Sequence, residues 1–284
     1  MNHTNDKSIA LTNTTLKKPH LVLGGAGFIG VAVTRELLKQ QLPVRVFARH
    51  RASLPPDLAN NENLEWFAGD FQNQSDLNAA LKGVASVTHL ITTVVPASAN
   101  NDPKYDVKSN ILPSITLLDL MVANNVKKIV FVSSGGTVYG PSDQASISET
   151  SPTNPIVAYG VSKLAIEKYL LLYKHLHKLE PVILRVANAY GEGQPLNRSQ
   201  GAVGIFLNQA LSKRTIEIWG DGSVTRDYIY VGDIADAVAS SIKYTGTETV
   251  FNIGMGQGTT LNQLICHIEQ ATEQTLDVQY HDSR

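Results

Sequence analysis

A tyrosine and a lysine four positions apart are the residues of this chain that most clearly suggest chemistry. Tyr159 and Lys163 stand in a helix-like stretch over residues 156–179, and a spacing of four places two side chains on one face of a helix. A tyrosine with its usual pKa of about 10 is a poor base at neutral pH, but a nearby ammonium favours the phenolate. The pair therefore predicts a tyrosine that exchanges protons with a hydroxyl or a carbonyl.

A glycine-rich loop precedes this pair by roughly 130 residues. Residues 25–30 match the pattern G-x-G-x-x-G, directly after an apolar run at 20–24 and before a helix-like segment at 31–40. Glycines at Gly24, Gly27 and Gly30 permit a tight turn and close approach of a pyrophosphate to a helix N-terminus. We therefore predict a dinucleotide site, in which a cationic nicotinamide adds to Lys163 in favouring the phenolate.

The end of the second predicted strand bears on the choice between NAD and NADP. No Asp or Glu lies between Glu36 and Asp57, and the strand runs into Arg49 and Arg51. An acid at this position binds the adenosine ribose 2′-hydroxyl, whereas an arginine accommodates a 2′-phosphate. The arginines either face such a phosphate or are solvated loop charges, so the cofactor is NAD, with NADP possible. If they face a phosphate, NADP(H) binds at least as tightly as NAD(H).

Alternating elements must position these residues. Apolar runs predict strands at 20–24, 43–47, 63–67, 84–91, 128–132 and 182–186, and intervening patterns predict helices at 31–40, 75–83, 105–125 and 156–179. In the third of these helices Pro113 is an interruption, and Ser75 is the predicted N-cap of the second. Parallel neighbours need crossovers, so the pattern predicts an α/β fold with a Rossmann-like doubly wound parallel sheet. Its ligands lie beyond the carboxyl ends of the strands.

The pattern changes near residue 187 to short strands and glycine turns, which predicts a second region. We expect a flexible arm at 1–19, a dinucleotide-binding domain at 20–186 with a return segment near 231–253, and a smaller α/β substrate-binding lobe. The lobe comprises 187–230 and 254–284, and we expect it to be incomplete at the C-terminus.

Composition restricts the class of protein. Of 284 residues, 43% are hydrophobic and 17% are charged, which favours a globular chain over a disordered one. A net charge of −1 argues against a nucleic-acid partner. The single cysteine, Cys266, excludes an intrachain disulfide and favours a cytoplasmic location. We expect no secretory signal and no membrane span. His175 and His177 are two apart on a helix, so no metal site is expected.

Together these motifs resemble the extended short-chain dehydrogenase/reductase family, in its NAD-dependent epimerase/dehydratase group. The resemblance runs from about Leu21 to the end of the chain. It rests on segments 24–30, 69–70, 131–140, 159–163, 184–191 and 219–231.

The resemblance implies a set of cofactor and substrate contacts. Cofactor contacts would come from Gly27, Phe28 and Ile29 at the pyrophosphate, Asp70 and Phe71 at the adenine end, Leu90, Ile91 and Thr92 beside the dinucleotide, and Ser133, Tyr159 and Lys163. Substrate contacts would come from Asn188 on the sugar nucleotide, and from Arg226 and Arg284 on its diphosphate. Asn188 could instead cap a loop, and Arg226 could instead pair with Asp227 or Asp221.

One departure from the family pattern concerns the hydroxyl that hydrogen-bonds the reacting oxygen. Gly135 stands where the family usually has Ser or Thr, so Ser134 or Thr137 would take over that catalytic role. The dehydratases of the family carry a carboxylate pair where this chain has Gly136 and Thr137. Elimination would lack its proton donors here, so dehydration and decarboxylation are disfavoured.

The resemblance thus implies a nucleotide-sugar 4-epimerase, acting by transient hydride transfer to a tightly bound nicotinamide cofactor, with a UDP-hexose as substrate. The alternative is an NAD(P)H-dependent reductase of a keto-sugar nucleotide or another carbonyl. A third class is a dinucleotide sensor without catalysis. By analogy, the helices at 105–125 and 156–179 would form a homodimer interface.

Overall fold

A seven-stranded parallel sheet forms the centre of the computed structural model, which describes residues 18–50, 54–142, 144, 146–196 and 201–282. Its strand order is β10-β6-β5-β4-β1-β2-β3, so the order reverses between β1 and β4. This confirms the predicted doubly wound sheet and places the ligand crevice at that reversal. The strands are β1 (His20–Leu23), β2 (Val44–Ala48), β3 (Leu64–Ala68), β4 (Ser86–His89), β5 (Lys128–Ser134), β6 (Glu180–Val186) and β10 (Val250–Ile253).

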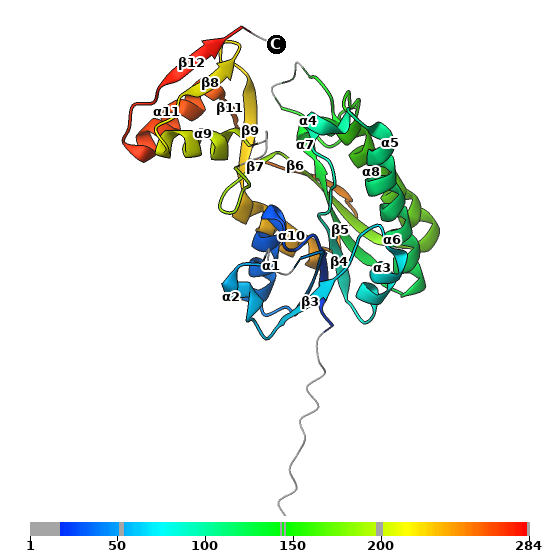
Figure 1. Cartoon of the computed structure of the whole chain (residues 1–284). Helices are drawn as coiled ribbons and strands as arrows, with labels where there is room; N and C mark the ends of the chain where they lie inside the picture. The colour runs from blue at the N-terminus through cyan, green and yellow to red at the C-terminus, as the bar shows by residue number, and fades with distance from the viewer. Residues whose placement is uncertain (1–17, 51–53, 143, 145, 197–200, 283–284) are drawn as a thin grey trace, which may run out of the picture.

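Helices cover both faces of this sheet (Figure 1). One hydrophobic cluster joins the sheet to α3 (Gln74–Leu81), α6 (Leu112–Ala123) and α8 (Ala158–His177). A second cluster joins the opposite face to α1 (Phe28–Lys39), α2 (Pro56–Ala59) and α10 (Val231–Lys243). Because both faces are covered, β1 and β4 are buried along their whole length, as their apolar runs predict.

Two predicted helix details differ from the structure. Asn73, rather than Ser75, caps α3, because the Asn73 side chain accepts hydrogen bonds from the backbone N–H groups of Ser75 and Asp76. The chain around Pro113 stays helical through α5 (Pro103–Asp106), a π-helical turn at Val107–Ile111 and then α6. Pro113 stands near the start of α6, directly after the π-helical turn. Short helices α4 (Pro96–Ala99) and α7 (Gly135–Val138) follow β4 and β5.

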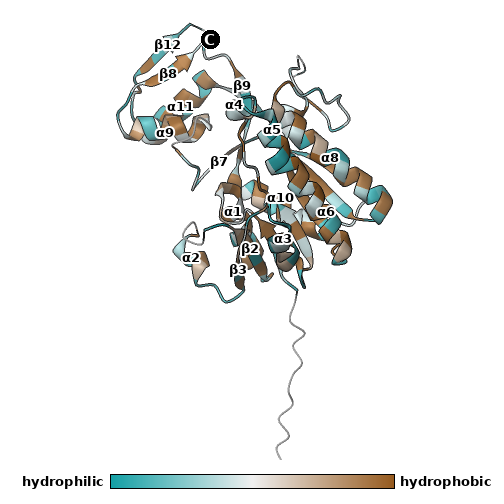
Figure 2. Ribbon diagram, turned by 45° about the vertical axis from the view of Figure 1, so that its right-hand side comes forward, coloured by the Kyte–Doolittle hydropathy of each residue, from teal (hydrophilic) through white to brown (hydrophobic). Residues whose placement is uncertain are grey.

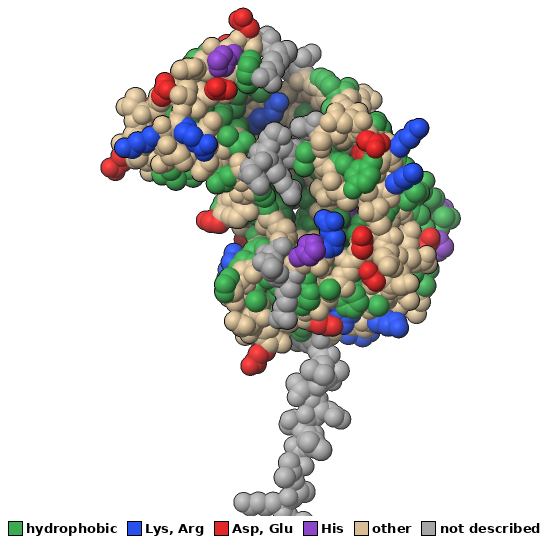
Figure 3. Space-filling model, in the orientation of Figure 1, with side chains coloured by type: hydrophobic (Ala, Val, Ile, Leu, Met, Phe, Trp, Pro, Cys, Tyr) green, Lys and Arg blue, Asp and Glu red, His purple; other side chains and the backbone are tan. Residues whose placement is uncertain are grey.

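A smaller lobe follows β6 and lies to one side of the large sheet (Figure 1), and the space-filling view shows the surface indented between the two (Figure 3). A three-stranded sheet in it contains β7 (Asn188–Tyr190), β9 (Thr225–Tyr230) and β11 (Gly258–Thr260). Two parallel strands, β8 (Ile216–Trp219) and β12 (Val278–His281), pack with α9 (Ala202–Leu211) and α11 (Leu261–Thr272) around a core of their own. The domain boundaries stay a prediction, and residues 1–17 of the expected arm lie outside the described residues.

No described helix is long and apolar enough to cross a membrane. Within the same residues, no group of three or more His, Cys, Asp or Glu side chains is arranged to hold a metal ion.

Candidate active site

The first turns of α8 bring Tyr159 and Lys163 together at the carboxyl end of β5. Lys163 is 6% exposed, and its Nζ donates a hydrogen bond of 2.9 Å to the Val132 carbonyl oxygen. The same Nζ lies 4.8 Å from the ring centroid of Phe131 and 5.7 Å from that of Tyr159. The predicted shared face is therefore present, with the ammonium held by the strand beneath it.

The charge state of this pair differs from the sequence expectation. Burial raises the pKa of Tyr159 to about 12, and the negative charge of Asp106 adds to that effect. Burial lowers the pKa of Lys163 to about 8, although Asp106 and Glu167 oppose the change. The protein alone therefore does not make Tyr159 acidic, because burial and the charge of Asp106 both disfavour the phenolate.

The loop between β1 and α1 has the shape that a pyrophosphate needs. Gly24 has a φ of +84°, which favours glycine. A Cβ on Gly30 would lie 2.1 Å from the Gly24 carbonyl oxygen, so only glycine lets the helix begin so close to the turn. No side chain caps α1 at Gly27, and its first turn contains no acidic residue, so its N–H groups suit an anion.

The loop after β4 lies directly beside this glycine turn. A Cβ on Gly24 would lie 3.1 Å from Ile91 Cγ1 and 3.6 Å from the Leu90 carbonyl carbon. Thr92 follows, with its hydroxyl donating to the Val94 carbonyl oxygen. The two loops meet at the strand-order reversal, which brings together the residues predicted to contact a dinucleotide.

The residues predicted to contact the adenosine end of the cofactor differ in their exposure. The Asp70 carboxylate accepts a hydrogen bond from the Gln72 N–H at 2.9 Å and is at the surface. Phe71 is 5% exposed, and its ring packs 4.9 Å from the His89 ring, so only its backbone can reach a ligand. Arg49 is exposed beyond the end of β2, whereas Arg51 lies outside the described residues.

The serine and threonine positions after β5 have distinct surroundings. The Ser133 hydroxyl donates to Glu167 Oε1, so its proton is used in a hydrogen bond inside the protein. Thr137 packs against Gly160, the neighbour of Tyr159, and its Oγ1 is buried with no hydrogen-bond partner among the described residues. Ser134 ends β5 and is partly exposed. Ser134 and Thr137 therefore stay the two predicted alternatives for the hydroxyl missing at Gly135.

Gly135 has a steric reason to depart from the family pattern. A Cβ on Gly135 would lie 3.0 Å from the Arg185 carbonyl oxygen of β6, which is tighter than ordinary contact. A serine at this position would therefore require the backbone of β6 to move.

A buried ion pair beneath the site was not predicted from the sequence. Arg185 Nη2 donates to Glu167 Oε2 at 2.7 Å, and both side chains are at most 5% exposed. Arg185 Nη1 donates to the Tyr139 hydroxyl, which in turn donates to Asn252 Oδ1. The signal in the sequence is an arginine within the otherwise apolar run of β6, since buried charges are rarely unpaired.

The substrate-side residues lie on the small lobe. Asn188 Nδ2 donates to the Asp227 carbonyl oxygen at 3.0 Å, which joins β7 to β9. Arg226 is exposed on β9 and donates to the Thr225 carbonyl oxygen. Asp227 and Asp221 instead accept hydrogen bonds from backbone N–H groups. Neither forms an ion pair with Arg226 in the described part of the chain. Arg284 lies outside the described residues.

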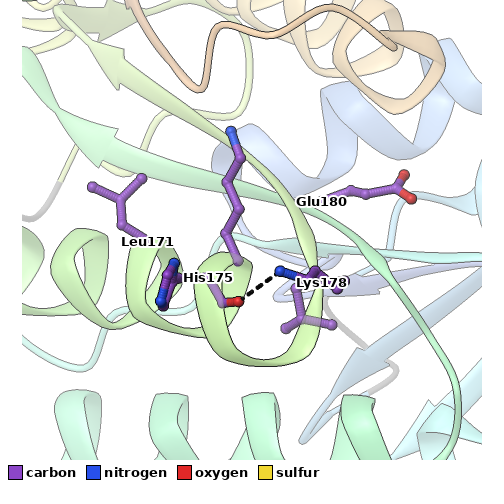
Figure 4. A pocket seen from close by; sticks show the side chains of 6 residues that line it. Leu171, His175, Lys178 and Glu180 are labelled. Atoms are coloured by element: carbon purple, nitrogen blue, oxygen red, sulfur yellow. Dashed lines mark hydrogen bonds between the residues drawn. The ribbon is translucent and has the colours of Figure 1, made fainter.

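A surface hollow of about 600 Å³ lies elsewhere, at the C-terminal end of α8 (Figure 4). Lys178 donates to the His175 carbonyl oxygen there, and Lys174 donates to Thr249. His175 is sixteen residues from Tyr159, or about 24 Å along the helix. This hollow is therefore separate from the site.

Known proteins resemble the chain in both sequence and structure. The sequence model of the "NAD dependent epimerase/dehydratase family" matches residues 20–254. An Escherichia coli protein named dTDP-4-dehydro-6-deoxyglucose reductase is 36% identical over 88% of this chain and 80% of its own length. A putative UDP-glucose 4-epimerase of Methanocaldococcus jannaschii is 35% identical over 86% of this chain and 79% of its own.

Two solved structures share the arrangement. The UDP-glucose 4-epimerase of Thermus thermophilus in complex with NAD has a TM-score of 0.84 at 30% identity, covering 94% of this chain and 87% of its own. The UDP-glucose 4-epimerase of Thermotoga maritima with UDP-glucose has a TM-score of 0.86 at 33% identity, covering 94% and 86%.

Fold, site and sequence define an extended short-chain dehydrogenase/reductase. More narrowly, the chain belongs to the NAD-dependent epimerase/dehydratase family and is an NAD-dependent epimerase/oxidoreductase enzyme.

Proposed function

We propose that this protein is a nucleotide-sugar 4-epimerase that acts on a UDP-hexose. The observation that carries the proposal is the Tyr159–Lys163 pair beside the glycine turn, on a scaffold shared with epimerases at TM-scores of 0.84 and 0.86. NAD, when bound, supplies a reversible hydride acceptor. The rest of the chemistry belongs to the residues of this chain.

Tyr159 accepts and returns the proton of the sugar 4-hydroxyl. Its phenolic oxygen takes that proton as the ring carbon is oxidised and gives it back when the carbon is reduced. Lys163 favours the phenolate, since its ammonium is fixed 5.7 Å from the tyrosine ring by the Val132 carbonyl, and a bound nicotinamide cation would add to this effect against the burial of the ring. Ser134 or Thr137 holds the reacting oxygen in place of the hydroxyl that is missing at Gly135.

Cofactor contacts follow from the two adjoining loops. Gly24, Gly27 and Gly30 leave the backbone open to the pyrophosphate, with Phe28 and Ile29 in the first turn of α1. Asp70 and the backbone of Phe71 face the adenine end, and Leu90, Ile91 and Thr92 line the side of the dinucleotide. We propose that Ser133 supports the cofactor indirectly, because its hydroxyl is bound to Glu167. The exposed Arg49 would accommodate a 2′-phosphate, so NADP could bind in place of NAD.

Substrate contacts come from the small lobe. The exposed guanidinium of Arg226 suits the diphosphate, because its planar fork can bind phosphate oxygens in a bidentate manner. Asn188 and Arg284 complete the predicted set of sugar-nucleotide contacts. The proposed substrate therefore bridges the proton-transfer site and the small lobe.

Association into a homodimer is part of the proposal. Val161, Tyr169, Leu172 and Leu176 are exposed along α8, and Leu112 is exposed on α6. Figure 2 shows apolar stretches along these two helices. An exposed apolar face of this kind is typical of an interface between subunits. We further propose a cytoplasmic location, since a free and exposed Cys266 suits a reducing compartment.

A second candidate function is net reduction of a 4-keto-sugar nucleotide. It is favoured by the 36% identity to a dTDP-4-dehydro-6-deoxyglucose reductase. An exposed Arg49 that could admit NADPH also supports it.

Mass spectrometry and turnover assays of the purified protein distinguish these functions. We expect mass spectrometry of released small molecules to find NAD, and the protein to interconvert UDP-glucose and UDP-galactose with no added cofactor. Consumption of NADPH with a keto-sugar nucleotide, without interconversion, would support the reductase. An absence of turnover with both substrate classes would favour a dinucleotide sensor.

A further inference from the structure

Asp106 is a buried acid beside the Tyr159–Lys163 pair that the mechanism above does not use. It ends α5, is 1% exposed, and packs against α8. Its Oδ2 accepts a hydrogen bond of 2.9 Å from the Ser162 hydroxyl, and its Oδ1 accepts one of 2.8 Å from Asn110 Nδ2. Both oxygens act as acceptors, which is the pattern of an ionised carboxyl group.

The other charged groups that face the pair are already compensated or neutral. Glu167 of α8 is paired with Arg185 of β6 at 2.7 Å. His89 of β4 has a pKa lowered to about 3 by its burial and by Lys163, so its ring is neutral. Within the described residues, the donors to the Asp106 carboxylate are the uncharged Ser162 and Asn110, and no ion pair neutralises its charge beside the pair.

We propose that Asp106 is a positioning residue for the Tyr159–Lys163 pair: it supplies a fixed negative charge beside the pair and anchors the helix that carries it. The anchor is direct, because Ser162 lies between the two residues on α8. The charge acts on both members of the pair, since Asp106 favours the protonated forms of Tyr159 and Lys163 alike.

The π-helical turn at Val107–Ile111 explains how one helix reaches two parts of the site. Asn110 donates to Asp106, while its Oδ1 accepts from the Thr93 N–H at 2.9 Å in the loop after β4. Ser114, one turn later, donates to the Asn110 carbonyl oxygen and accepts from His89. Such turns are frequent at functional sites. A single chain of hydrogen bonds thus ties α8 to the loop predicted to flank the cofactor.

The variant Asp106→Asn separates the charge from the anchor. Its amide can donate to the Ser162 hydroxyl while its oxygen still accepts from Asn110, so the hydrogen bonds remain and the charge is lost. Ser162→Ala does the opposite, because it removes the anchor and keeps the charge. Asp236→Asn removes an exposed charge from α10, on the opposite face of the sheet, and is the matched control.

The titration of Lys163 can be followed without any substrate. In full-length protein labelled with ¹³C at the lysine ε-carbons, the Lys163 signal is assigned by its loss in K163M. We expect a midpoint of about 8 in the unaltered protein, lowered by about half a pH unit or more in D106N and unchanged in D236N. An unchanged midpoint in D106N, or an equal change in D236N or S162A, would overturn the role of the charge.

A poorly folded D106N would not end the test. D106E and D106Q have equal length and differ only in charge, so the same midpoint difference is expected between them, and equal midpoints would contradict the proposal.

The kinetic consequence rests on the proposed function. We expect the limb of turnover that rises with pH, which follows ionisation of Tyr159, to move to lower pH in D106N, because the charge that favours the protonated phenol is lost. S162A should lower turnover without moving that limb; normal turnover in S162A would remove the anchoring role. If the Lys163 midpoint moves as expected but no nucleotide sugar is turned over by the unaltered protein, the proposed substrate is wrong and the assignment of Asp106 stands.

Discussion

The two sides of the proposed site are built very differently. On the side of the large sheet, Lys163 of α8 and Asp106 of α5 are 6% and 1% exposed and are fixed by hydrogen bonds. On the small lobe, Arg226 is exposed, and its guanidinium donates a hydrogen bond to the carbonyl oxygen of its own neighbour, Thr225. Proton transfer needs positions fixed to within a fraction of an ångström. Binding a diphosphate tolerates an adjustable side chain. The rigid residues would therefore determine the reaction, and the exposed arginine would let the lobe adapt to the substrate.

The largest effect is expected on the fixed side. Replacing Tyr159 by Phe removes the proton carrier but keeps the ring, so turnover should fall by about 10²- to 10⁴-fold. Retention of NAD should not change, as measured by mass spectrometry of the released cofactor. The control is Tyr169→Phe, an exposed tyrosine on the same helix. Turnover close to normal in the Tyr159 variant would refute the mechanism.

A smaller effect is expected on the adjustable side. Replacing Arg226 by Ala should raise the KM for the nucleotide sugar by about tenfold or more, because two charge-assisted hydrogen bonds are lost. Arg226→Lys should recover only part of the affinity, since an ammonium lacks the planar fork. An unchanged KM in both variants would show that another group binds the diphosphate.

Acid should lower the stability of the region around the large sheet in particular. His89 has a pKa of about 3 in the folded protein, against 6.5 as its ordinary value, because it is buried. Between these values the unfolded chain binds a proton that the folded chain does not. The free energy of unfolding should therefore fall by about 1.4 kcal/mol per pH unit as the pH drops below about 6.5.

Trp66 in β3 and Trp219 in β8 allow this acid effect to be followed in each region separately. In W219F, urea midpoints read from Trp66 fluorescence should decrease between pH 7 and pH 5. His89→Gln should reduce the slope. An equal slope in H89Q would assign the pH dependence to other groups.

The smallest effect concerns the adenosine end. If Arg49 faces a 2′-phosphate, Arg49→Ser should weaken NADP binding by about tenfold and leave NAD binding unchanged. Titration of cofactor-free protein with both dinucleotides measures this difference. A strong preference of the unaltered protein for NAD would show instead that Arg49 is a solvated surface charge.

Regular patterns made the fixed side largely predictable. Continuous apolar runs specify buried parallel strands such as β5 and β6, and the glycine loop and the Tyr159–Lys163 spacing are local signals. The Asp106–Ser162 contact and the Glu167–Arg185 pair escaped prediction, because each joins two elements that are distant in the sequence or follow no regular spacing.

Local details were less predictable, because several residues compete for the same role. Asn73 and Ser75 are both good N-caps, and only the path of the chain after β3 selects Asn73. Phe71 follows Asp70 in the motif, yet its ring turns into the core. The contacts of Arg226 could not be read from the sequence either, because an exposed arginine has no environment that fixes its partner.

The seventh strand of the large sheet has a consequence for how the chain folds. β10 pairs with β6 only after some sixty residues have passed through the lobe and α10. Until residues 250–253 leave the ribosome, β6 is an unprotected edge with its backbone groups ready to pair with any passing strand. This closure over a long loop is slow, so the nascent chain is open to aggregation until β10 has been made and has paired with β6.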